Sequence, residues 1–75
     1  MLYHFHIREQ GHLILDEEGS ELPNLAAARA EARASVRDLL AEEMKSGDAK
    51  PDRSIEITDP SGRLLECIAV SKVLH

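Results

Sequence analysis

The segment Leu25–Lys45, LAAARAEARASVRDLLAEEMK, constrains the fold more than any other part of this chain. It is rich in Ala, Leu, Glu and Arg, which are strong helix formers. Asn24 precedes it as a candidate N-cap, and Gly47 follows it as a C-terminal stop. Apolar residues recur at steps of three and four and form one stripe: Leu25, Ala28, Ala32, Val36, Leu39, Leu40 and Met44. The segment predicts one amphipathic helix of about 20 residues, roughly 30 Å long.

Alternating segments on both sides of this helix predict the surface that it covers. Apolar and polar residues alternate from Leu2 to Arg8, and His12–Leu15 has the pattern of a returning strand. After the helix, Ser54–Thr58 and Arg63–Val70 flank the turn sequence DPSG. We expect a single α+β domain over 1–75, with hairpins at about 2–15 and 54–70 around a helix at about 25–45. The order β-β-α-β-β predicts a four-stranded antiparallel sheet with the helix packed on one face.

The register of the first hairpin depends on the length of its loop. A three-residue loop, Glu9 to Gly11, opposes Arg8 to His12 and directs Leu13 and Leu15 into the core. A two-residue loop instead opposes Ile7 to Ile14 and leaves both leucines on the open face of the sheet. The first register buries more apolar residues and is preferred, whereas the second predicts an apolar face that needs a partner.

Three histidines near the start of the chain are candidates for a metal site. His4 and His6 alternate with Tyr3 and Phe5, so they belong to the face that the helix leaves open, and His12 joins them only in the first register. A His-x-His pair supplies two zinc ligands, while a closed site needs four and a catalytic one usually three. The leading interpretation is therefore surface histidines on a solvated or dimer-forming face. Metal binding through His4, His6 and His12 is the alternative.

Composition and charge make several classes of partner and location less favoured for this chain. The chain has 75 residues, 14 acidic against 9 basic ones and a formal net charge of −5, which disfavours nucleic acids and anionic membranes as partners. No signal peptide and no stretch of about 20 apolar residues is seen. The single Cys67 fits a reducing compartment, so we expect a cytoplasmic protein in which Cys67 is a buried apolar residue.

Charged residues offer two weaker candidate sites. The acidic cluster Asp16, Glu17, Glu18 and Glu21 lacks the ligand pattern of a calcium loop and is interpreted as a solvated turn. Arg29, Arg33 and Arg37 recur every four residues and form a basic ridge on the first half of the helix. Because cations there oppose the helix dipole, we expect Arg29 or Arg33 to contact the acidic connector. Nucleic-acid binding by this ridge ranks third among the functions considered.

No catalytic triad, phosphate loop or dinucleotide motif is present, so we expect no enzymatic activity and no cofactor. The leading hypothesis is a small interaction protein that acts as a homodimer or as an adaptor for another protein. The candidate partner-binding residues are His4, His6, Arg8, Arg29, Arg33 and Arg37.

Three stretches carry a resemblance to a known family: FHIR near the start, DEEGSELPNLAAARAEA over 16–32 and IEITDPSGRLL over 55–65. In these the chain resembles small bacterial proteins of a domain-of-unknown-function family, the one numbered six-eight-nine-four. The resemblance implies a free-standing bacterial domain with no assigned activity, so no site residues are carried over from it. The family has Asp-Gly at the first hairpin turn where this chain has Glu9-Gln10-Gly11, so the resemblance leaves the register open.

Overall fold

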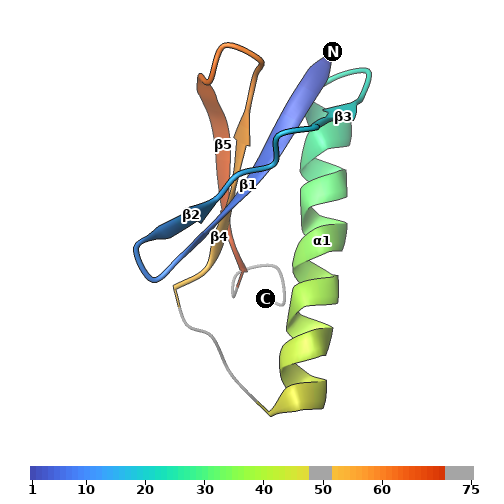
Figure 1. Ribbon diagram of the computed structural model, residues 1–75. Helices are drawn as coiled ribbons and strands as arrows, with labels where there is room; N and C mark the ends of the chain where they lie inside the picture. The colour runs from blue at the N-terminus through green and yellow to red at the C-terminus, as the bar shows by residue number, and fades with distance from the viewer. Residues whose placement is uncertain (48–51, 71–75) are drawn as a thin grey trace.

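The computed structural model describes residues 1–47 and 52–70 and confirms the predicted α+β architecture. A twisted antiparallel sheet has the strand order β2-β1-β4-β5, and one long helix lies on one of its faces (Figure 1). A short strand that the sequence did not predict, β3, pairs with β1 as well. The elements are β1 Leu2–Glu9, β2 His12–Ile14, β3 Ser20–Glu21, α1 Leu25–Ser46, β4 Ser54–Thr58 and β5 Leu64–Ala69.

Both ends of α1 are capped by the residues that the sequence indicated. The Asn24 side chain accepts a hydrogen bond from the Ala27 amide at 2.9 Å. Gly47 adopts a left-handed conformation with φ 70°, and its amide donates to the Glu43 carbonyl. Each cap satisfies backbone groups that the helix itself leaves unpaired.

The core lies between α1 and the sheet. Ala28, Ala32 and Val36 are fully buried on the helix side, and the small alanines allow the helix to approach the sheet closely. The sheet contributes Tyr3, Ile55 and Ile57, with Val70 beside them. Partly buried side chains surround this centre: Phe5, Leu22, Leu25, Leu39, Leu40, Leu65 and Ile68.

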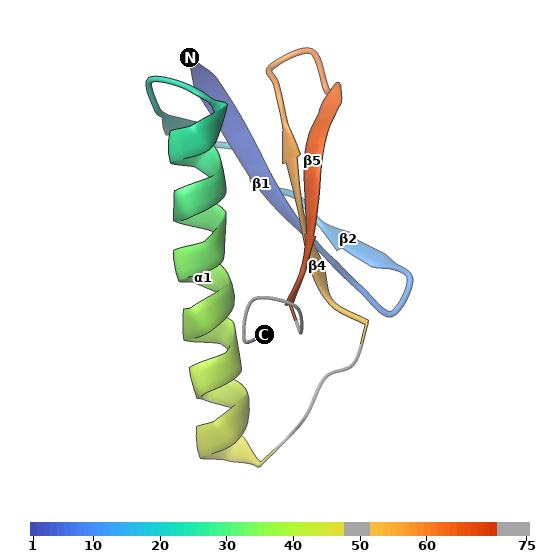
Figure 2. The ribbon, with the colours of Figure 1, turned by 180° about the vertical axis from the view of Figure 1, so that it is seen from behind.

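Met44 does not follow the predicted stripe into the core. It is 84% exposed because the last turns of α1 extend beyond the strands (Figure 2). Cys67 is exposed too, so its predicted burial is wrong. It lies opposite Glu56 on the face of the sheet that α1 does not cover, where nothing packs over it among the described residues.

The first hairpin adopts the two-residue loop, so the preferred three-residue register is wrong. Glu9 pairs with His12 and Ile7 with Ile14. Gln10 and Gly11 both have positive φ, 46° and 81°, as in the turns whose twist matches that of paired strands. The hairpin projects away from α1 in both views (Figures 1 and 2), so this end of the sheet has no core into which the leucines could be directed.

Candidate functional site

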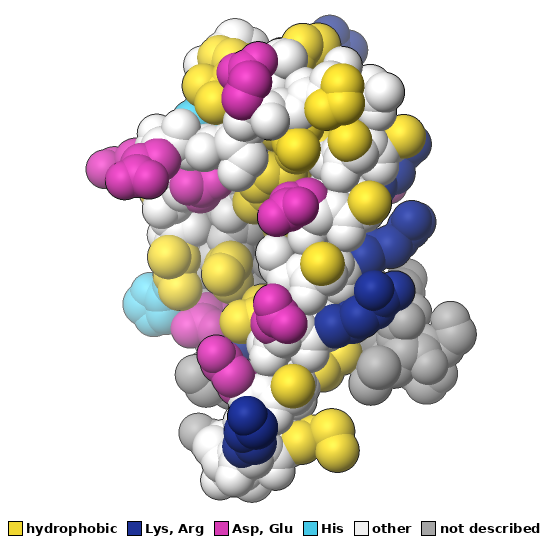
Figure 3. Space-filling view, turned by 90° about the vertical axis from the view of Figure 1, so that its right-hand side faces the viewer, with side chains coloured by type: hydrophobic (Ala, Val, Ile, Leu, Met, Phe, Trp, Pro, Cys, Tyr) yellow, Lys and Arg dark blue, Asp and Glu magenta, His cyan; other side chains and the backbone are white. Residues whose placement is uncertain are grey.

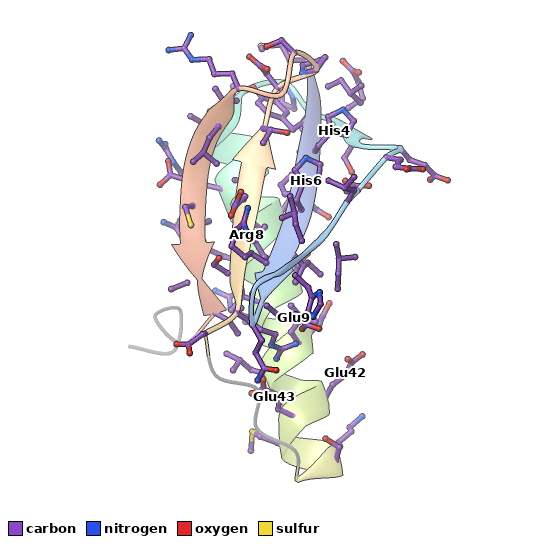
Figure 4. The ribbon with its side chains drawn as sticks, turned by 60° about the vertical axis from the view of Figure 1, so that its left-hand side comes forward. His4, His6, Arg8, Glu9, Glu42 and Glu43 are labelled. Carbon is purple, nitrogen blue, oxygen red and sulfur yellow. The ribbon has the colours of Figure 1, made fainter. Side chains whose placement is uncertain are left out.

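The open face of the sheet is the surface opposite α1, and β1 contributes His4, His6 and Arg8 to it (Figure 4). The two imidazole rings are stacked, with centroids 5.8 Å apart and planes 9° from parallel. Across the sheet His4 lies opposite Thr58, and His6 opposite Glu56. His12 is not part of this group, because its pairing with Glu9 places it on the helix side of the sheet.

The chain that follows β2 folds over the two histidines and is held by them. His4 Nδ1 donates to the Asp16 carbonyl at 2.7 Å, since a carbonyl can only accept. His6 Nδ1 accepts from the Asp16 amide at 3.0 Å, so the proton of the neutral ring is on Nε2, which donates to Thr58 Oγ1 at 3.1 Å. The two side chains therefore replace the backbone partners that a neighbouring strand would supply.

The Asp16 carboxylate closes a gap in the sheet. Strands β2 and β3 both pair with the same edge of β1, β2 along Ile7–Glu9 and β3 along Leu2–Tyr3, and neither reaches Phe5. Asp16 Oδ2 accepts from the Phe5 amide at 3.1 Å, and Oδ1 accepts from the Gly19 amide at 3.2 Å. The acidic connector is therefore partly structural, because one of its carboxylates completes the edge of β1.

Gly19 sits where the connector returns to β1, and we expect its substitution by alanine to lower the free energy of unfolding by about 2 kcal/mol. Its φ is 74°, and an added Cβ would lie 2.9 Å from the Tyr3 carbonyl oxygen, a backbone atom that has little freedom to move. Urea denaturation measures the loss.

Gly62→Ala is the matched control, because Gly62 also has a positive φ, 89°, but has open space around it. Its free energy of unfolding should fall only by the cost of placing a residue with a Cβ at positive φ, about 1 kcal/mol. Equal losses in the two variants would show that the close approach to Tyr3 is unimportant.

A groove of about 280 Å³ lies between the connector and the β4–β5 turn. Its lining residues are His4, His6, Leu15, Asp16, Glu17, Thr58, Asp59, Pro60 and Gly62. The pKa of Asp59 is lowered by the hydrogen bond from the Ser61 hydroxyl, 2.6 Å, and by that from the Arg63 amide, 2.9 Å. Asp59 is therefore a carboxylate that stabilises the turn.

The histidines have little capacity left for a metal ion. Both nitrogens of His6 are engaged within the fold, and Nδ1 of His4 is engaged as well. Within residues 1–47 and 52–70 no group of three or more His, Cys, Asp or Glu side chains is arranged to hold a metal. The structure therefore brings together two of the three candidate ligands and separates the third.

Arg8 is the third predicted side chain on the open face. It forms an ion pair with Glu56, and this hydrogen-bonded contact raises the pKa of its guanidinium above the ordinary value. The Arg8 side chain is 47% exposed, so solvent screens the ion pair and its contribution to stability is small.

The arginine ridge contacts a different partner from the one expected. Arg29 Nε donates to Glu66 of β5 at 3.0 Å, so the predicted contact with the acidic connector is wrong for Arg29. Arg33 and Arg37 are exposed, and basic side chains follow one side of α1 in Figure 3. The β5 strand runs beside this side of the helix, whereas the connector crosses the opposite edge of the sheet. The order of the strands in the sheet decides which of the two lies near Arg29, and the sequence alone could not show that order.

The most exposed apolar segment of the sheet is β2 and the residue that follows it. Leu13 is 39% exposed, Ile14 50% and Leu15 58%. Leu13 lies opposite Arg8, which places it on the open face, and Leu15 lines the groove beside His4 and His6. Sequence reasoning identified this surface only through the register that it did not prefer.

Comparison with known proteins gives a family but no described activity. The family model described as a domain of unknown function matches residues 2–71. Neither the curated proteins nor the solved structures include a match to the chain. No helix in the described part of the chain is long and apolar enough to cross a membrane. The match covers nearly the whole sequence, and the chain therefore belongs to the family of the domain of unknown function DUF6894.

Proposed function

We propose that this protein is a non-enzymatic interaction module that acts as a homodimer, with β2 and the adjoining open face buried between the two subunits. The observation that carries the proposal is the exposure of three successive large apolar side chains, Leu13, Ile14 and Leu15. Leu13 and Leu15 share the open face and Ile14 lies on the opposite face, so this edge of the sheet exposes apolar side chains on both of its sides. Exposed apolar side chains that cluster in this way mark interaction sites.

The roles of the histidines support a function without catalysis. His4 and His6 hold the connector through hydrogen bonds to Asp16, so they maintain the shape of the face. Metal binding is less favoured than assembly because a metal would have to displace bonds that His6 makes on both nitrogens. Nucleic-acid binding is less favoured because Arg29 is paired and the net charge is negative.

Light scattering coupled to size exclusion tests the proposal. We expect the wild-type protein to have the mass of two chains at concentrations on the order of 100 μM. Leu15→Glu should shift it to a monomer, because the interface would then bury an unpaired carboxylate.

Leu64→Glu is the matched control, since Leu64 is similarly exposed, 55%, but lies on β5 at the other edge of the sheet. Circular dichroism establishes that both variants fold. A wild-type monomer throughout this concentration range, or equal effects of the two substitutions, would refute the homodimer.

A further inference from the structure

We infer that the two subunits pair β2 with β2 in antiparallel orientation, with Ile14 at the two-fold axis and Leu13 of each copy opposite Leu15 of the other. This inference rests on the proposed homodimer and specifies how its two sheets join. It makes one continuous sheet from two and assigns the free edge of β2 as the contact.

The backbone of the segment His12–Asp16, here called the edge segment, presents hydrogen-bonding groups to a partner. The amide and carbonyl of Asp16 both point toward β1, where His6 and His4 bind them. Backbone groups of successive residues in an extended chain point in opposite directions. Leu13 and Leu15 therefore direct their amides and carbonyls away from β1, toward the free edge.

The edge segment contains a short strand, β2, of three residues, but it lacks the other features that protect sheet edges. Natural edge strands are blocked by lysine, proline, bulges or inward charges, and no lysine, proline or bulge interrupts residues 12–16. The opposite edge, β5, carries Glu66 and an irregular register near Thr58. Since the first hairpin also projects away from α1 (Figure 2), the helix does not cover its edge.

The register follows from which residues are extended. Pairing Leu13 with Leu13 would place Leu15 against Gly11, which belongs to the turn and has φ 81°. Pairing Leu15 with Leu15 would require Glu17, which lies in a bend. Only Leu13 opposite Leu15 uses the outward groups of both residues in both copies, and two such hydrogen-bonded pairs supply four backbone hydrogen bonds.

Side chains are compatible with this register on both faces. Leu13 and Leu15 of the two copies form one cluster on the open face, and Ile14 packs against Ile14 on the other face. His12 of each copy faces Asp16 of the other, so this position brings no like-charged pair together. A second copy of the chain therefore pairs apolar with apolar side chains at Leu13, Ile14 and Leu15 and adds no like-charged pair.

Disulfide trapping tests the register in the full chain carrying Cys67→Ser. Ile14 of the two copies forms a pair without backbone hydrogen bonds, with Cα atoms about 4.5 Å apart, inside the range that a disulfide spans. Ile14→Cys should therefore form a covalent dimer under mild oxidation. Leu13→Cys and Leu15→Cys should each form little covalent dimer on their own, because identical residues of the two copies are offset by two positions. A mixture of the two variants should cross-link, because Leu13 of one copy lies opposite Leu15 of the other.

Leu64→Cys gives the background from random collisions, and circular dichroism establishes folding of each variant. Cross-linking of Leu13→Cys or Leu15→Cys alone above this background, with none for Ile14→Cys, would overturn the register. If the wild-type protein is a dimer but all the edge-segment cysteine variants cross-link only at the background level, edge pairing is overturned. The homodimer would then form through another surface. A wild-type protein that is monomeric by light scattering would overturn both proposals.

Discussion

Replacement of Asp16 by alanine is expected to lower the free energy of unfolding by about 3 kcal/mol, because two backbone amides lose a charged hydrogen-bond acceptor. The carboxylate accepts from Phe5 on β1 and from Gly19 in the connector. Phe5 lies in the gap between β2 and β3, so no neighbouring strand supplies a replacement. The amide of Asp16 itself is held by His6, and the loss should therefore also loosen the connector over the histidines.

Chemical denaturation of matched variants measures this effect. Asp16→Asn retains one carbonyl oxygen as acceptor and should lose less than Asp16→Ala. Glu17→Ala is the control for charge, since Glu17 is the adjacent acidic residue and its side chain is exposed. It should change the free energy of unfolding by no more than about 0.5 kcal/mol. Equal losses for Asp16→Ala and Glu17→Ala would refute the structural role of Asp16.

Local chemistry allowed the helix to be predicted from the sequence. Asn24 and Gly47 act on backbone groups within four residues of themselves, and the buried Ala28, Ala32 and Val36 follow the helical repeat. Strands β1, β2, β4 and β5 were identified for the same reason, because alternation is also a local pattern, whereas the two-residue β3 was not. Such features depend little on which segments later become neighbours.

The candidate site depends on contacts between distant residues, and sequence reasoning recovered less of it. The choice between two hairpin registers was made on apolar burial, but the hairpin lies away from α1 and no core is available there. The connector was interpreted as a solvated turn because the gap at Phe5, which Asp16 fills, exists only after β2 and β3 have paired with β1. His4 and His6 were assigned to the correct face, but their bonds to Asp16 could not be inferred from spacing.

The ion pair between Arg53 and Glu43 leads to the prediction with the largest effect on stability. It joins the start of β4 to the last turns of α1, and the two side chains are 5% and 17% exposed. Glu43→Ala would leave the Arg53 guanidinium buried without its carboxylate, a change that costs about 3–5 kcal/mol. A domain of 75 residues has a free energy of unfolding of roughly 4–11 kcal/mol, so we expect the variant to lose a large share of its stability and to unfold at a much lower temperature than the wild type.

A double substitution separates the loss of a partner from the loss of packing. Glu43→Leu combined with Arg53→Met removes both charges and keeps apolar volume, and we expect it to recover most of the stability that Glu43→Ala loses. Arg53 Nε is buried with no hydrogen-bond partner in the described part of the chain, so removal of the guanidinium also removes an unsatisfied donor. Arg8→Ala removes the exposed counterpart of this pair and should be much less destabilising than Glu43→Ala. Thermal denaturation that ranks Arg8→Ala as more damaging than Glu43→Ala would show that burial does not determine the contribution of these pairs.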